Sequence, residues 1–503
     1  MSAPIAIAGL VGRRAVAADG FARLDVDAAT WAALAAGAAA GLHDMIALWA
    51  DEAVVRIALG DVTAGVRAIA SLKLSARSYP SVGQHHAPAI RLERAMRDLA
   101  GVVPEGLPDD RAWLDHGAWV KPPPGRGEAV VPASHAYAFL AVDGEGMHQI
   151  PVGPVHAGII EPGHFRFTAN GEAVVRLEQR LGYVHKGVEA LCAGADIERA
   201  GRIAARMSGD STVAYGFAFA RAVEVALGWR PPERALILRG VMAEMERIAH
   251  HIGDVGAICN DASVVAIQAR CTLLREDILR VAGECFGHRM MMDRIVPGGV
   301  GVDLTAAGAD KIRDLLARCQ TGFETAVRAY DSMPSLADRT VTTGIAMPEY
   351  VRRFAAGGFV GRASGRAFDA RANPAYAPYD GVKFDVPVRT AGDVDARVWI
   401  RIDEVRQSMA IIRQLLDKLR AGPIAEPSPK LQAGEGAALV EAFRGDVFLT
   451  VRLDASGKVA HLHARDASWF QWPLLEAAIE GNIVADFPLC NKSFNCSYSG
   501  HDG

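Results

Sequence analysis

The stretch ALILRGVMAEMERIAHHIG at residues 235–253 decides the fold of the larger part of this chain. Its apolar side chains recur at steps of three and four residues, which places them on one side of an α-helix. The members of this stripe are Leu238, Val241, Met245, Ile248 and Ile252. Such a stripe buries against other helices, so we expect the chain around it to be mainly helical.

The flanking sequence extends this expectation. Residues 186–329 are largely helical in pattern, and residues 401–419 form another amphipathic helix that stops at Gly422-Pro423. Two antiparallel strand pairs are expected, at residues 164–168 with 174–177 around Asn170-Gly171, and at residues 447–451 with 459–463. The second part of the chain is therefore predicted to be mainly α-helical with small β elements.

The first 120 or so residues have a different pattern. A helix is expected at residues 27–42, with Asp27 or Thr30 near its start, then strands at 54–59 and 68–74, and a helix at 91–100. A passage rich in Pro and Gly follows and favours an extended connection. We predict an α+β protein: a small α+β domain at 1–125, a linker at 126–145 and the mainly helical domain at 146–503.

Composition excludes several classes of protein. Of the 503 residues, 50% are hydrophobic and 22% charged, and the formal net charge of -4 gives no basic field for nucleic acid. The Ala-rich run at 28–42 is shorter than the roughly 18 apolar residues of a membrane span. The seven cysteines form no C-x-x-C pair, so we expect no disulfide framework, no iron–sulfur cluster held by this chain alone, and a reducing compartment.

An ordered set of motifs carries a family resemblance. It consists of GPVH at 153–156, EPGHF at 161–165, YVHKGVE at 183–189, EMERIAHH at 244–251, VPGGV at 296–300, RASG at 362–365 and EAFRG at 441–445. Together they resemble the large subunit of group 4 membrane-bound NiFe hydrogenases and the homologous quinone-site subunit of respiratory complex I. The N-terminal unit, with RLERAMRD at 91–98 and WLDHG at 113–117, resembles the small hydrophilic subunit fused ahead of it in the hydrogenase-4 and formate hydrogenlyase type.

The resemblance implies a metal site whose ligands this chain lacks. A NiFe centre needs four thiolates, because soft sulfur suits nickel and iron. The family's first pair, R-x-C-G-x-C, falls on Arg206 to Ser211, with serine at 208 and 211. One alignment of the second pair, D-P-C-x-x-C, puts Cys496 on the first cysteine and Ser499 on the second. We therefore expect no NiFe centre and no other cofactor bound by this chain.

The complex I resemblance implies a quinone cavity instead. Its proton donors are a tyrosine, whose place is taken here by Gly209, and a loop histidine, which matches His156. Half of the usual donor pair is thus missing. Arg206 and Asp210 are expected to face the cavity, with Asp210 either carrying protons or hydrogen-bonding Arg206 at the i, i+4 spacing. Glu161 either relays protons or holds its hairpin.

Two sets of neighbouring polar residues on the helix expected at 235–253 have simpler interpretations. Glu244 and Glu246 fall on different faces, so at most one is expected to point inward, with the other solvated or paired with Arg247. His250 and His251 are expected to be satisfied core or interface histidines.

The resemblance implies that the chain works within a complex. Its expected partners are a small iron–sulfur subunit, other hydrophilic iron–sulfur subunits and membrane antiporter-like subunits, at the cytoplasmic face of the membrane. The leading hypothesis is a peripheral-arm subunit of a hydrogenase-4-like oxidoreductase complex that lacks a NiFe site and couples electron transfer, with quinone as one candidate acceptor, to ion translocation. The alternatives are a non-catalytic scaffold or coupling subunit, and an active NiFe hydrogenase.

Overall fold

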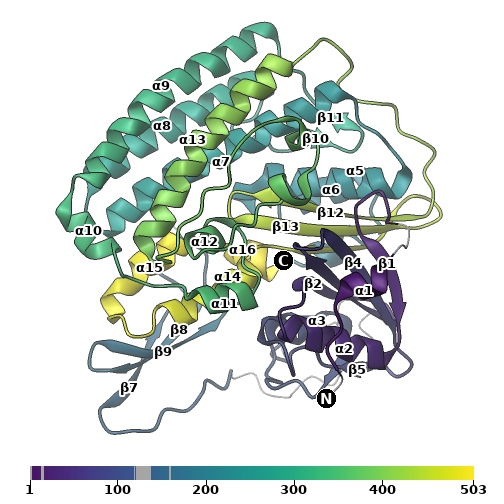
Figure 1. Cartoon of the computed structure of the whole chain (residues 1–503), viewed down its shortest axis with the longest axis vertical. Helices are drawn as coiled ribbons and strands as arrows, with labels where there is room; N and C mark the ends of the chain where they lie inside the picture. Colours follow the sequence, from purple (N-terminus) through teal and green to yellow (C-terminus); the bar gives the residue numbers. More distant parts are fainter. Residues whose placement is uncertain (1–2, 13–15, 118, 120–136, 158–159) are drawn as a thin grey trace.

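The helix around residues 235–253 spans Glu233–Asp261 (α7) and lies at the centre of the larger part of the molecule. The computed structural model describes residues 3–12, 16–117, 119, 137–157 and 160–503. Helices α8 (Val265–Phe286) and α13 (Val394–Lys418) pack along α7, and α9 (Ala306–Asp331) packs on α8 (Figure 1). The apolar stripe of α7 is buried throughout, as its period predicts.

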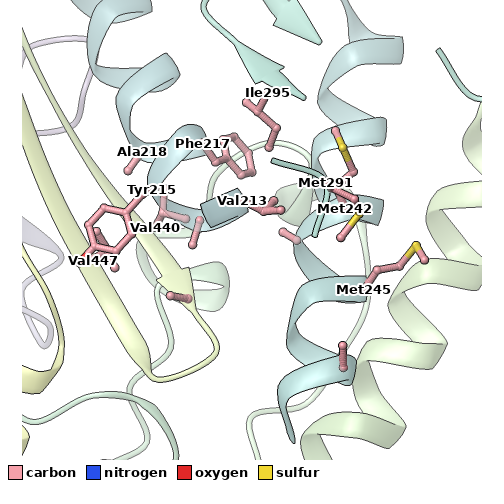
Figure 2. Packing of buried hydrophobic residues seen from close by; sticks show 14 of the residues in the cluster. Val213, Tyr215, Phe217, Ala218, Met242, Met245, Met291, Ile295, Val440 and Val447 are labelled. Atoms are coloured by element: carbon pink, nitrogen blue, oxygen red, sulfur yellow. The ribbon is translucent and has the colours of Figure 1, made fainter. Parts of the chain in front are cut away.

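A second layer joins this bundle to a sheet. Helix α6 (Thr212–Leu227) lies between α7 and the antiparallel strands β12 (Gly434–Ala442), β13 (Gly445–Leu453) and β14 (Val459–Arg465). Figure 2 shows the resulting core, where Phe217 of α6 and Met242 of α7 approach Met291 and Ile295, while Val440 and Val447 come from the sheet. Met207, which borders the candidate site described below, belongs to this core.

The remaining elements of the second part are short. They are β7 (Met147–Val152), β8 (His164–Asn170), β9 (Ala173–Arg180), α4 (Val188–Cys192), α5 (Ile197–Ala204), η2 (Gly209–Ser211), β10 (Ile295–Val296), β11 (Gly299–Val300), α10 (Pro334–Thr340), α11 (Pro348–Arg353), α12 (Gly358–Ala363), η3 (Arg371–Ala375), η4 (Tyr379–Gly381), α14 (Ser468–Ala478), η5 (Val484–Asp486), α15 (Phe487–Phe494) and α16 (Tyr498–Asp502). Strands β7, β8 and β9 form one antiparallel sheet.

The N-terminal unit is a small α/β layer. Its elements are α1 (Ile7–Val11), β1 (Ala22–Val26), α2 (Ala28–Ala39), β2 (Asp44–Asp51), β3 (Val54–Asp61), β4 (Val66–Lys73), β5 (Ser78–Pro80), η1 (Ala87–Ala89), α3 (Ile90–Ala100) and β6 (Val103–Glu105). The main sheet has the order β1-β4-β3-β2. Asp27 caps α2 by accepting the Thr30 N–H at 2.8 Å, and Gly101 ends α3 in the left-handed region.

The N-terminal unit packs directly on the second part. The ring of Trp49 in β2 stacks on His463 in β14 at 5.3 Å, and Phe21 meets Phe448 edge-on at 5.7 Å. Arg452 donates to both carboxylate oxygens of Asp51 at 2.7 and 2.8 Å. Part of the expected linker at 126–145, residues 126–136, lies outside the described residues, and the domain division stays a prediction.

The predicted α+β class is confirmed, and three local expectations need correction. Helix α13 begins at Val394, capped by Asp393, earlier than the expected residue 401. The sheet near the end of the chain has three strands instead of the expected two, because β12 pairs with β13 and was not predicted. The helical stretch 186–329 is interrupted after α8 by the short β10–β11 pair.

Candidate functional site

The two segments that carry the family's metal-ligand positions meet at a pair of serine hydroxyls. Ser208 lies just before η2, and Ser497 caps α16 at the end of the chain. Their Oγ atoms are 2.8 Å apart, and both residues are buried. Ser497 Oγ also accepts the Gly500 N–H at 2.9 Å. The fold therefore preserves the convergence of the two segments.

This contact corrects the alignment of the second ligand pair. The four ligands of one metal centre must converge, and the residue that meets Ser208 is Ser497, not Cys496. The C-x-x-C spacing then places the last position at Gly500, where an added Cβ would lie 2.9 Å from Ser497 Oγ. Cys496 is buried, and burial raises the pKa of its thiol.

The other two expected ligand positions also carry no thiol. Ser211 is buried, and its Oγ has no hydrogen-bond partner among the described residues. Ser499 is nearly buried, and its N–H donates to Glu161 Oε2 at 3.0 Å. Glu161 thus reaches the C-terminal segment from the loop between β7 and β8.

Asp210 pairs with Arg444 rather than with Arg206. Both Nη atoms of Arg444 donate to the Asp210 carboxylate, at 2.7 and 2.6 Å, and Ser208 Oγ donates to Asp210 Oδ1 at 2.8 Å. Burial raises the pKa of Asp210, but the Arg444 guanidinium outweighs this effect and holds the pKa well below its usual range. The expected Asp210–Arg206 hydrogen bond is wrong because Arg444, at the turn between β12 and β13, is the closer cation.

Arg206 instead lies at the surface. Its two Nη atoms donate to the Asp293 carboxylate at 2.6 and 2.7 Å, and its side chain is 43% exposed. Gly209 is also exposed, with no atom within 4 Å of an added Cβ. These two positions therefore form a surface beside the buried serine pair.

His156 stays on its hairpin loop. Its Nε2 lies 2.8 Å from the carbonyl oxygen of Gly163, and its half-buried ring packs near Phe165. Its role as a proton donor stays a prediction.

Lys186 was missed by the sequence analysis although it lies in the quoted motif YVHKGVE. Its Nζ donates to the carbonyl oxygens of Met207 and Ser499, at 3.1 and 3.4 Å, and so links the two segments.

Two ionisable residues of α7, Glu246 and His250, lie close enough to Asp210 to interact with its charge. Glu246 accepts the N–H groups of Val213 and Ala214, at 2.8 and 3.2 Å, and burial raises its pKa to about 8. Burial lowers the pKa of His250 to about 4, and its Nε2 has no hydrogen-bond partner among the described residues.

The expectation that at most one of Glu244 and Glu246 points inward is wrong, whereas the expected pairing with Arg247 is confirmed for Glu244, at 3.3 Å. Glu244 is fully buried and Glu246 is 4% exposed. Glu244 faces Arg371 instead of solvent. Both faces of α7 are covered, because the helices α6, α8 and α13 pack against it.

The donor atoms at the four ligand positions do not fit a NiFe centre. Hydroxyl groups are normally protonated and are poor ligands for soft metals, and Gly500 offers no side chain. Within the described ranges, no group of three or more His, Cys, Asp or Glu side chains is arranged to hold a metal ion. The same part of the chain contains no helix that combines the length and apolar character needed to cross a membrane.

Comparison with known proteins shows the family of the chain. Residues 261–433 match the family model described as respiratory-chain NADH dehydrogenase, 49 Kd subunit. Formate hydrogenlyase subunit 5 of Escherichia coli K12 is 30% identical over 436 residues, which cover 84% of this chain and 77% of that protein. The chain belongs to this family of complex I 49 kDa-type and related hydrogenase large subunits.

Other relatives show the breadth of the family. An NADH-quinone oxidoreductase subunit of Carboxydothermus hydrogenoformans is 30% identical over 348 residues, 67% of this chain and 93% of that protein. A chain of the membrane-bound sulfane sulfur reductase, an archaeal respiratory membrane complex, superposes with a TM-score of 0.68 at 25% identity, covering 71% of this chain and 99% of that chain. The structural neighbour is thus part of a respiratory membrane complex, and the matching family model describes a respiratory-chain subunit.

Proposed function

We propose that this chain is the peripheral-arm subunit of a complex I-related oxidoreductase complex in which the NiFe centre has been replaced by a hydrogen-bonded protein cluster. The observation that carries the proposal is the Ser208–Ser497 contact, supported by the Asp210–Arg444 pair beside it. Arg444 is nearly buried and therefore needs a negatively charged partner. In this chain the Asp210 carboxylate supplies that charge.

We place the electron path at the surface beside the Ser208–Ser497 and Asp210–Arg444 pairs. A small iron–sulfur subunit would dock over the exposed Arg206–Asp293 pair and bring its cluster close to the serine pair. Other hydrophilic iron–sulfur subunits would supply the electrons. Antiporter-like membrane subunits would bind this arm at the cytoplasmic face of the membrane and translocate ions.

Two acceptors are supported by particular relatives. Quinone is the acceptor named for the NADH-quinone oxidoreductase relative, and sulfane sulfur is the acceptor named for the structural neighbour. Neither requires nickel in this chain. We place quinone first, because His156 and Glu161 keep the loop positions of the quinone-site resemblance.

The test uses the complex purified with its partner subunits. Its iron–sulfur clusters are reduced chemically, and their reoxidation is followed by absorbance after adding a water-soluble quinone or, separately, polysulfide. Rapid reoxidation by quinone supports the proposal as stated, and rapid reoxidation by polysulfide alone favours the second acceptor. No reoxidation by either would overturn the oxidoreductase assignment in favour of a scaffold.

A further inference from the structure

A cluster of buried charges lies deeper than the candidate site, where α7, α12 and α13 meet β12. Its charged members are Arg247, Arg362, Arg371, Glu244, Asp369, Glu404 and Glu441, and the imidazole of His251 borders it. Each of these side chains is at most 1% exposed. We refer to these eight residues as the arginine–carboxylate cluster.

Arg362 is the centre of this cluster. Its Nη2 lies 2.7 Å from Glu404 Oε1, and its Nη1 donates to Glu441 Oε1 at 2.9 Å. The same Nη1 is 3.5 Å from Asp369 Oδ2. One guanidinium group therefore faces three carboxylates.

The other two arginines do not remove the excess of negative charge. Arg371 pairs with Asp369 at 2.7 Å and with Glu244 at 3.0 Å. Arg247 lies 3.3 Å from Glu244 and 3.7 Å from Glu404. Both arginines thus share carboxylates that already have a cationic neighbour.

The charges of the cluster do not balance. Three guanidinium groups face four carboxylates, which leaves one uncompensated negative charge if every acid is ionised. Two further charges border the cluster but have their own partners. Asp446 on β13 faces Glu441 and pairs with Arg465, and Arg401 faces Glu404 and pairs with Asp254. An isolated charge is costly in a buried environment, so such a cluster is expected to take up a proton.

Glu441 is the member best placed to hold this proton. Burial, followed by the neighbouring Asp369, raises its pKa, and Arg362 and Arg247 oppose this only in part. The Glu441 Oε2 atom also accepts the Ala370 N–H at 3.0 Å. The pKa of Glu404 is well below its ordinary value, because its cationic and imidazole neighbours outweigh burial. Burial lowers the pKa of His251, whose Nε2 lies 2.8 Å from Glu404.

The cluster has a connection to the surface. Arg371 and Tyr379 line an open groove of about 480 Å³ together with Lys383 and Gln407. The Tyr379 hydroxyl donates to Glu244 at 2.7 Å. The edge of the cluster therefore reaches this groove at Arg371.

We infer that the arginine–carboxylate cluster is a binding site for one exchangeable proton, carried on Glu441. Glu441 lies three residues before Arg444 on the same β-hairpin, and Arg444 pairs with Asp210. This site would let the subunit store a proton close to the candidate site. The inference rests on the charges of the cluster and holds whichever acceptor the complex uses.

Infrared difference spectroscopy of the full chain tests the inference. The spectrum of Glu441→Gln is subtracted from that of the native chain at pH 6 and again at pH 9. At pH 6 the difference is expected to contain the carbonyl band of one protonated carboxylic acid per chain, and at pH 9 this band is replaced by carboxylate bands. Carboxylate bands alone at both pH values would overturn the inference.

Two further variants serve as controls. Glu435→Gln changes a partly exposed glutamate on the same strand and should remove only carboxylate bands at both pH values. Glu441→Asp keeps a titratable group and should shift the protonated carbonyl band without removing it. Glu441→Gln should fold at pH 6, since the amide has the shape of the neutral acid. Failure of this variant to fold while Glu435→Gln folds would contradict a neutral Glu441.

Discussion

The side chain of Asp210 compensates for the arginine that occupies the centre of the candidate site. Arg444 is nearly buried, with a side chain 5% exposed, and such a cation needs a partner. Asp210 contributes that partner from a segment 234 residues away in the sequence. Sequence reasoning placed both residues in quoted motifs but paired Asp210 with the nearer Arg206, because only local spacing is visible in a sequence.

The Asp210→Ala variant should destabilise the chain by about 1 to 2 kcal/mol in urea unfolding. Removing one member of a fully buried pair costs about 3 to 5 kcal/mol. About a third of the Asp210 side chain remains exposed, which reduces the penalty through solvent screening.

The double variant Asp210→Ala with Arg444→Met is the control for this prediction. It removes both charges and should recover most of the loss, because no unpaired cation remains. Equal stability of Asp210→Ala and the native chain would show that Arg444 does not depend on this carboxylate.

Glu246 makes stability depend on pH. Burial raises its pKa from 4.5 to about 8, so the folded chain holds a proton that the unfolded chain releases. Between these two pH values the folded state binds more protons, and the free energy of unfolding must fall as pH rises. Glu246→Gln should make this decline less steep in thermal unfolding measured from pH 5 to pH 8.

The matched comparison is Glu198→Gln, at a glutamate whose side chain is 77% exposed on helix α5. This variant should follow the native pH profile. A Glu246→Gln profile with the native slope would mean that the buried carboxyl is ionised throughout this range.

At the level of elements, local pattern predicted the long helices and the strands β3, β4, β8, β9, β13 and β14, while the other strands and most of the short helices were not predicted. Helix α7 and the β8–β9 hairpin follow from the period of their apolar residues and from Asn170-Gly171. Strand β12 was missed, because its sequence GEGAALVEA is rich in Gly and Ala and has no alternation. It is buried on both faces, between α6 and its neighbours, where alternation is not required.

The approach of α6 to β12 explains the glycines in this strand. A Cβ added at Gly436 would lie 2.1 Å from the carbonyl oxygen of Ala222 in α6. Gly436→Ala should therefore lower the free energy of unfolding by about 1 to 3 kcal/mol, as overpacking does in other cores. Urea unfolding of the purified chain measures this change.

Gly422→Ala is the control for Gly436→Ala. No atom lies within 4 Å of a Cβ added there, so this variant should unfold like the native chain or slightly later. Equal stabilities of the two variants would contradict the close contact between α6 and β12.

On the scale of the whole molecule, the Arg206–Asp293 pair is the proposed contact for the iron–sulfur subunit. Exposed ion pairs contribute about 0 to 1 kcal/mol, so Arg206→Ala should leave the melting temperature almost unchanged. It should, however, reduce the amount of the small iron–sulfur partner that co-purifies with the tagged chain.

The comparison variant is Arg280→Ala, at a side chain that is 72% exposed on α8. It should recover the small iron–sulfur partner in native amounts. Native recovery with Arg206→Ala as well would place the electron-donating partner on another face.

The candidate site shows which ligand positions can be predicted from the sequence and which require the fold. The serines at 208 and 211 were visible from motif spacing alone. The position of Ser497, rather than Cys496, required the fold, because a shift of one residue in a short terminal motif leaves no trace in sequence pattern. The hydrogen bond between Ser208 and Ser497 resolves that register.

Metal analysis of the complex purified with its partners tests the central claim most directly. Cells are grown with added nickel, and the nickel content per chain is measured together with hydrogen-dependent dye reduction. The serine cluster predicts nickel far below one atom per chain and no dye reduction. Close to one nickel atom per chain, with hydrogen turnover, would contradict the replacement of the metal centre by Ser208, Ser497 and the Asp210–Arg444 pair.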